Sequence, residues 1–155
     1  MVQTARSRWR WVGVITLAAI WMVASTGWGA DAVPLPEPVP VPVSSGVYTE
    51  GQAETGRIAF VQHCAGCHGA ELQGGFGPRL APVDPFQFRD RPLAVLFAFM
   101  RTQMPFDAPG SLDDELYAAI LAYVLERNGY PTGLEPLTAD PDAWPQFVID
   151  DPPAP

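Results

Sequence analysis

The segment 69–88 constrains this chain more than any other, because its glycines and prolines prevent it from continuing the helical patterns on either side. It contains Gly74, Gly75, Gly77, Pro78, Pro82 and Pro85. A structureless loop of this length inside a compact domain is usually functional. It has little means of ordering itself, so we expect it to wrap around something.

The rest of the chain favours a small all-α domain. With 155 residues, one domain is expected, and 14 glycines and 18 prolines indicate long loops around a small core. No alternating pattern is long enough to build a sheet. Apolar periodicity predicts three principal helices, at about 50–63, 92–102 and 112–128.

Start and stop signals bound these helices. Thr49 and Gln52 have the spacing of a capping box at the first helix, and Ser111 and Asp114 have that spacing at the third. Gly129 is expected to close the third helix as a left-handed cap.

Residues 1–32 have the layout of a secretory signal peptide: three arginines, an uncharged run over 11–30, and small residues at the cleavage position. An uncleaved anchor, which would tether the chain to a membrane, is the alternative, since about 20 uncharged residues can just span a bilayer. Either way the mature chain is expected to be periplasmic. The proline-rich segment 33–47 is predicted to be an extended linker. Residues 134–155 are predicted to form an irregular tail, with Trp144 and Phe147 as candidate anchors.

The charge of the chain excludes one class of partner. The formal net charge is −8, and all nine cationic residues are arginines. Nucleic acid is therefore not an expected partner, because phosphate contacts need a basic surface.

Residues 64–68, Cys-Ala-Gly-Cys-His, carry the clearest chemical signal. C-x-x-C-H is the attachment signature of c-type haem. The thiols of Cys64 and Cys67 can reach two vinyl groups on one side of the macrocycle, and His68 can reach its iron as the proximal ligand. We therefore expect one covalently bound haem c.

Other interpretations of the cysteines agree less well with the sequence. A thioredoxin-like pair follows a strand and opens a helix, whereas this pair closes a helical pattern. A zinc site needs a second ligand pair at a longer spacing, and a structural disulfide does not need the histidine. His63 is poorly placed to bind the same iron, and we expect it at the surface.

The sixth iron ligand must come from elsewhere, and Met100 and Met104 are the candidates. Met100 falls on the apolar face of the second helix and is expected to pack in the core. Met104 follows that helix and precedes Pro105, so an extended loop can bring its thioether to the iron. A His/Met pair raises the reduction potential and fills both axial positions, which leaves electron transfer as the function.

Further residues extend the pattern: Gly56, Phe60, GGFGPRL at 74–80, Met104-Pro105, and LYAAILAYVLERNGYPTG at 116–133. Over roughly 49–133 the chain resembles a class I bacterial monohaem cytochrome c, and the cytochrome c domain is predicted at 48–133. More narrowly, it is similar to the small cytochrome c subunits and domains of periplasmic, quinoprotein-type dehydrogenases. The resemblance implies an electron carrier between a dehydrogenase and a terminal oxidase or another cytochrome. The lysine-rich docking rim of the mitochondrial branch is missing, since the chain has no lysine.

The resemblance also implies roles for individual residues. The first and last helices would cross at Gly56, with Phe60 against an aromatic of the last helix, Tyr123. The Pro78 carbonyl would accept the Nδ1–H of the proximal histidine, and Leu80 would pack against the haem. Pairing with the haem propionates is left open among Arg79, Arg89, Arg91 and Arg101.

Two alternatives remain at this point. One is a haem enzyme with an open axial site, acting as a peroxidase or a sulfur-compound oxidoreductase, which requires that Met104 does not bind. The other is an obligate cytochrome subunit of a dehydrogenase complex, tethered through the proline-rich segment.

Overall fold

The first long helix begins at Thr49, whose side-chain oxygen accepts a hydrogen bond from the backbone N–H of Gln52. In this computed structural model, residues 39–82, 88–144 and 146–153 are described. Helix α1 spans Glu50–His63, and the four-residue helix α2, Ala65–His68, follows it. The predicted signal peptide and the first part of the predicted linker lie outside the described residues.

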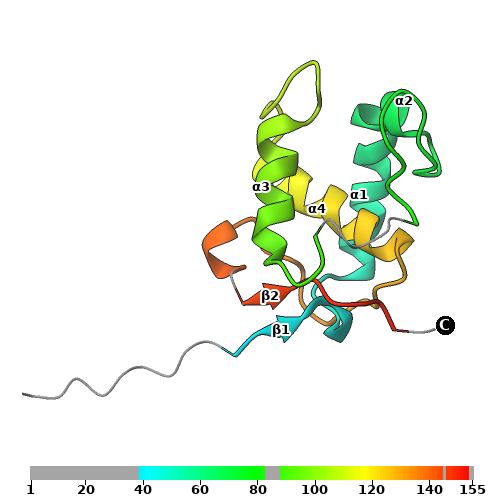
Figure 1. Ribbon diagram of the computed structural model, residues 1–155. Coiled ribbons are helices and arrows are strands. Elements are labelled where there is room, and N and C mark those ends of the chain that lie inside the picture. The colour runs from blue at the N-terminus through cyan, green and yellow to red at the C-terminus, as the bar shows by residue number, and fades with distance from the viewer. Residues whose placement is uncertain (1–38, 83–87, 145, 154–155) are drawn as a thin grey trace, which may run out of the picture. The chain divides into compact units, whose positions relative to one another are not determined.

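Helices α3, Leu93–Gln103, and α4, Asp114–Arg127, complete the helical framework. Pro92 stands at the N-cap of α3, one position before the helix in which it was expected. Gly129, with φ of 86°, follows the end of α4 in the left-handed conformation that was predicted. The expected all-α class is confirmed, and α4 crosses both α1 and α3 (Figure 1). Among the described residues, no helix combines the length and apolar character needed to cross a membrane.

The predicted capping boxes were only partly right. Gln52 does not return to Thr49, because its side-chain amide is hydrogen-bonded to the backbone O and N of Leu137, at 2.7 and 2.8 Å. At α4 the N-cap is Asp113, and the Asp114 carboxylate forms an ion pair instead of a capping box with Ser111. In both cases the side chain that local spacing assigned to the cap interacts instead with a residue more distant in sequence.

Helices α1 and α4 meet at a glycine, as expected. A Cβ on Gly56 would lie 1.8 Å from the carbonyl oxygen of Ala119, so only glycine permits this approach. One turn further along, the rings of Phe60 and Tyr123 pack with centroids 5.6 Å apart. This crossing fixes α4 relative to α1.

Short strands join the two ends of the described domain. Strand β1, Val41–Pro42, pairs in parallel with β2, Phe147–Val148. Single turns of 3-10 helix, Val43–Ser45 and Pro141–Ala143, lie next to them in sequence. Figure 1 shows both strands at the end of the domain opposite the loop between α3 and α4.

The segments on either side of the helices contribute to the core. Val43 and Trp144 are fully buried, and the rings of Trp144 and Phe97 lie 4.3 Å apart between centroids. Val43 falls within the predicted linker, yet it packs in the main cluster with Val47. The predicted anchor Phe147 packs against the same cluster while remaining partly exposed. Apolar side chains therefore draw both segments onto the helices.

Candidate haem site

His68 occupies the last position of α2 and is 7% exposed. Its Nδ1 lies 2.8 Å from the carbonyl oxygen of Pro78. A carbonyl can only accept, so Nδ1 carries the proton and the lone pair of the neutral ring is on Nε2. A Cβ on Gly77 would lie 2.8 Å from Cε1 of this ring, so the loop backbone fits closely against it. His68 is therefore held in a tautomer and an orientation suited to binding a metal through Nε2.

The two cysteines lie one helical turn apart and are free thiols. Cys64 caps the C-terminus of α1 and is partly buried, whereas Cys67 lies within α2 and is exposed. Burial, with a smaller contribution from Cys67, raises the pKa of the Cys64 thiol to about 11. Before haem is attached, the Cys64 thiol is therefore neutral at physiological pH.

The loop after His68 is more ordered than its composition predicts. Within 69–82, the backbone N–H groups of Gly74 and Gly77 donate to the carbonyls of His68 and Cys67, each at 2.8 Å. Leu72 is fully buried, and its carbonyl accepts from the N–H of Leu80 at 2.8 Å. The expectation that this segment lacks means of ordering itself is wrong for these residues, because the carbonyls of the C-x-x-C-H turn supply acceptors. Residues 83–87 of the loop lie outside the described part of the chain.

Asn128 at the end of α4 holds this loop from the other side. Its Nδ2 donates to the carbonyl of Leu80 at 2.8 Å and to that of Val124 at 2.7 Å. Leu80 itself packs against the cluster that contains Phe60 and Tyr123. Sequence reasoning missed Asn128, because a polar residue before a cap glycine is ordinary and nothing local indicates a partner 48 positions away.

Met104 and Met100 lie in different settings. Met104 caps α3 in extended conformation, with φ of −127° and ψ of 151°, and is partly buried. Its carbonyl accepts a hydrogen bond from the hydroxyl of Tyr117 at 2.6 Å. Met100 lies within α3 and packs against both core clusters. Sequence reasoning gave Tyr117 no role at the site.

The remaining candidates lie at the surface or form ion pairs. His63 is exposed, as expected. Arg89 pairs with Asp151, and Arg101 pairs with Asp114 at 2.9 Å. Arg79 and Arg91 are exposed.

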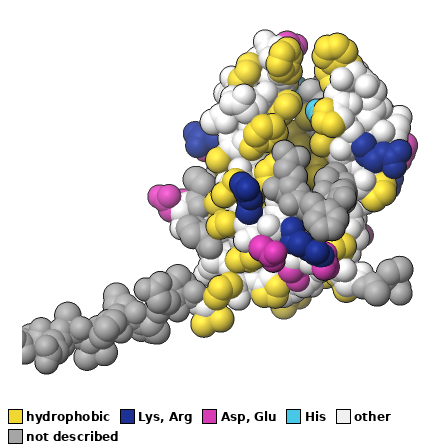
Figure 2. Space-filling view, in the orientation of Figure 1, with side chains coloured by type: hydrophobic (Ala, Val, Ile, Leu, Met, Phe, Trp, Pro, Cys, Tyr) yellow, Lys and Arg dark blue, Asp and Glu magenta, His cyan; other side chains and the backbone are white. Residues whose placement is uncertain are grey.

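A space-filling view shows a cleft between the α3 side and the α1–α2 side of the domain, with hydrophobic side chains along its walls and a histidine on one wall (Figure 2). Partly buried apolar residues pack against the second core cluster, among them Leu80, Leu112 and Leu116. An apolar cleft, the thiols of the C-x-x-C-H turn, an imidazole with an available Nε2 and the methionine thioethers of the α3 end supply the groups that a c-type haem requires. The residues present therefore fit a haem.

Comparison with known proteins agrees with this arrangement. A family described as "Cytochrome C oxidase, cbb3-type, subunit III" matches residues 51–124. Cytochrome c-551 of Bacillus subtilis is 31% identical over 84 residues, which cover 54% of this chain and 71% of that protein. The dihydro-heme d1 dehydrogenase of Pseudomonas aeruginosa is 38% identical over 76 residues, 46% of this chain but only 15% of that protein.

A solved structure shares the fold. The sulfane dehydrogenase SoxCD from Paracoccus pantotrophus aligns with a TM-score of 0.51 at 25% identity, over 73% of this chain and 61% of that one.

The fold and the site define a small class I cytochrome c domain, as the sequence predicted. The chain belongs to the cytochrome c family. It carries covalently bound haem c, and a cytochrome c domain implies haem-based electron transfer.

Proposed function

We propose that this protein is a periplasmic electron carrier in which Cys64 and Cys67 attach the haem while His68 and Met104 are the axial ligands. The observation that carries the proposal is the 2.8 Å contact between Nδ1 of His68 and the Pro78 carbonyl, because it leaves the lone pair of Nε2 available to bind a metal. We assign Leu80 to the wall of the haem pocket. The haem-binding region proposed is 48–133, with a signal peptide and the predicted linker 33–47 before it and the predicted tail 134–155 after it. Val43, Val47 and Trp144 of these flanking segments pack into its core.

The bound haem supplies a single iron that changes oxidation state by one electron. The chain's own residues set the conditions for this change. The hydrogen bond to Pro78 makes His68 a stronger donor, and the soft, neutral thioether of Met104 favours ferrous iron. With His68 and Met104 as its two protein ligands, the haem would leave no position for a small molecule, so this assignment would make the protein a carrier rather than an enzyme.

Two exposed phenylalanines support a docking surface beside the ligands. Phe76 is 90% exposed in the loop that binds His68, and Phe106 is 76% exposed two residues after Met104. Exposed aromatic side chains are enriched where proteins bind one another. We propose that a redox partner contacts these residues.

The proposed partner is a periplasmic dehydrogenase on one side and an oxidase or a second cytochrome on the other. Two similar proteins are named as dehydrogenases, which supports the first assignment. The charge of −8 favours a partner with a basic rim, and the association rate would then fall as salt is added.

The experiment uses the full chain, matured with haem, as bait for periplasmic and membrane fractions. The recovered dehydrogenase is then mixed with the ferric protein, and the rate of reduction is followed by absorbance. We expect rapid reduction that slows several-fold in Phe76→Ala/Phe106→Ala. Leu134→Ala, which removes a 96% exposed leucine in the tail, is the matched control and should leave the rate unchanged.

Two outcomes would contradict the proposal. If the ferric protein binds cyanide within the mixing time and lacks the far-red methionine–iron band, an open-site enzyme is the better assignment. If the native protein co-purifies only as part of a stable complex and the isolated chain is not reduced, it is an obligate subunit.

A further inference from the structure

The hydroxyl of Tyr117 forms a short bond to the backbone of Met104. The Tyr117 Oη donates to the Met104 carbonyl at 2.6 Å, and Tyr117 is 1% exposed. The same carbonyl accepts a longer bond from the N–H of Gly110, at 3.4 Å. The backbone of Met104 is thus held from α4 and from its own loop.

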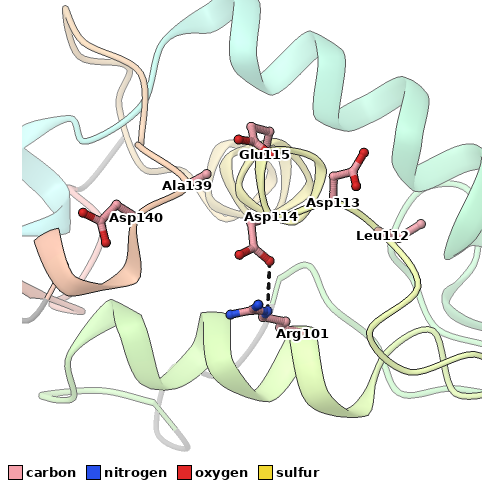
Figure 3. A pocket seen from close by; sticks show the side chains of 7 residues that line it. All are labelled: Arg101, Leu112, Asp113, Asp114, Glu115, Ala139 and Asp140. Carbon is pink, nitrogen blue, oxygen red and sulfur yellow. Dashed lines mark ion pairs between the residues drawn. The ribbon is translucent and has the colours of Figure 1, made fainter.

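A second link joins the same two helices. Arg101, near the end of α3, pairs with Asp114, at the start of α4, with 2.9 Å between Nε and Oδ1. Figure 3 shows the Asp114 side chain pointing from α4 to Arg101. Asp114 and Tyr117 are three residues apart, so they project from the same side of α4. The first turn of α4 therefore faces the end of α3, from which Met104 extends.

We propose that Tyr117 is a positioning residue that holds the segment 104–113 in place and so slows the departure of the Met104 sulfur from the iron. The inference rests on the proposed assignment of Met104 as the sixth ligand. Tyr117 acts through the backbone of Met104, whose carbonyl accepts its hydroxyl hydrogen.

The energetic reason is that the hydroxyl belongs to a buried side chain. For the thioether to leave, its segment must move, and the Tyr117 hydroxyl would then lose its acceptor in a setting that is only partly open to water. The net contribution of such a hydrogen bond corresponds to a change of about fivefold to tenfold in an equilibrium or a rate. The Arg101–Asp114 pair contributes less, because both side chains are substantially exposed and solvent screens them.

Tyr117→Phe removes only the hydroxyl and keeps the ring, whose centroid lies 6.5 Å from that of Phe97. The matched control is Tyr48→Phe, because the Tyr48 hydroxyl also donates to a carbonyl from a buried position, at 2.5 Å, but its acceptor is Tyr130. Both variants lose one hydrogen bond from a tyrosine hydroxyl to a backbone carbonyl, buried for Tyr48 and partly buried for Tyr117. They differ in whether that bond holds the methionine segment.

The test measures cyanide binding to the ferric, haem-bearing protein at saturating cyanide, where the rate is limited by departure of the methionine. We expect about a fivefold rise in Tyr117→Phe. Tyr48→Phe should stay within about twofold of the wild type, although its free energy of unfolding falls by a similar amount. Equal rates in the two variants would overturn the role of Tyr117, because the effect would then follow stability alone.

Two further variants separate the possible failures. Met104→Ala should bind cyanide at once and lose the methionine–iron band; if it does neither, the ligand assignment is wrong and the inference falls with it. If Met104→Ala behaves as expected but Tyr117→Phe matches the wild type, only the inference is wrong. Arg101→Gln should change the rate by less than about twofold. A larger rise there than in Tyr117→Phe would assign the holding role to the ion pair and overturn that of Tyr117.

Discussion

Gly56 lies so close to Ala119 that a methyl group on the glycine would stand 1.8 Å from the alanine carbonyl oxygen and 3.0 Å from the N of Ile120. The obstacle is helix backbone, which cannot turn aside as a side chain can. This crossing sets the position of α4, and α4 supplies both Tyr117 and Asn128, which hold the two loops of the site. One glycine therefore determines the relative placement of the proposed axial ligands.

We expect Gly56→Ala to lower the free energy of unfolding of the haem-bearing protein by about 3 kcal/mol or more, because the helices must separate. The control is Gly51→Ala in the first turn of the same helix, where an added Cβ meets nothing within 4 Å. That variant should gain up to about 1 kcal/mol from helix propensity. Denaturant titration checks both, and similar effects in the two variants would contradict the importance of the crossing.

Gly77→Ala should disturb the proximal histidine, because the new Cβ would lie 2.8 Å from Cε1 and 2.9 Å from Nδ1 of His68. We expect a loss of about 1–3 kcal/mol of stability. We also expect a higher reduction potential, since a weaker hydrogen bond to Pro78 makes the imidazole a poorer donor to ferric iron. Pro78→Ala keeps the accepting carbonyl and should shift the potential less. Potentiometric titration measures both shifts. A larger shift in Pro78→Ala than in Gly77→Ala would contradict the role of the loop backbone in holding His68.

Met104→His should lower the reduction potential on the order of 100 mV or more, because a nitrogen ligand replaces a soft sulfur that favours ferrous iron. Met100→Leu is the control, a swap of similar volume on the core-packed side of α3, and it should leave the potential unchanged. Spectroelectrochemistry measures both. If Met100→Leu abolishes the far-red band while Met104→His retains it, the assignment must be reversed.

Trp144→Ala should cost about 3–5 kcal/mol of stability, because the indole is fully buried against Phe97. Leu134→Ala, in the same tail but 96% exposed, should change stability by less than about 0.5 kcal/mol. Thermal and chemical unfolding of the two variants test whether the tail is part of the cooperative unit. A small effect of the tryptophan variant would place it outside that unit.

Alkaline pH should lower the free energy of unfolding of the wild-type protein. Burial, aided by the Glu126 carboxylate, raises the pKa of Tyr48 to about 12 from 10. As the pH rises, the unfolded chain therefore loses the Tyr48 proton before the folded chain does. The contribution of this hydroxyl to the free energy of unfolding is full below pH 10 and falls by up to about 2 kcal/mol as the pH approaches 12. Tyr48→Phe should make the decline shallower without removing it, because burial also raises the pKa of Tyr130. Parallel slopes for wild type and variant would show that Tyr48 is not responsible.

Local patterns predicted the helices and the attachment motif well. The limits of α1 were expected to within a residue, since Thr49 and the apolar spacing both act over one turn. The crossing at Gly56 and Phe60 was also expected, although from a family resemblance and not from spacing. Signals of this kind depend on residues close together in sequence or on a motif with one strong meaning.

The parts that sequence missed depend on distant partners. The bonds from Asn128 to Leu80 and from Tyr117 to Met104 join residues 48 and 13 positions apart, and neither residue is unusual in its own surroundings. Asp114 has the spacing of a capping-box residue, yet its carboxylate pairs with Arg101, because the end of α3 lies beside the first turn of α4 in the fold. The loop at 69–82 was expected to need an external support. Its N–H groups instead donate to carbonyls of the C-x-x-C-H turn and of the loop itself, and this pairing depends on the folded shape of the turn.

The pairing of Val41–Pro42 with Phe147–Val148 has a mechanical consequence. The strands run parallel, so a pull on the chain before Val41 against the chain after Val148 loads the rungs of the ladder together, in shear, instead of opening them one after another. The N–H of Val41 already bridges to the carbonyl of Gln146 at 2.6 Å, at the start of that ladder. Tension applied through the proline-rich segment before Val41 would therefore be borne by the β1–β2 pair. The cleft would carry this tension only after the pair had separated.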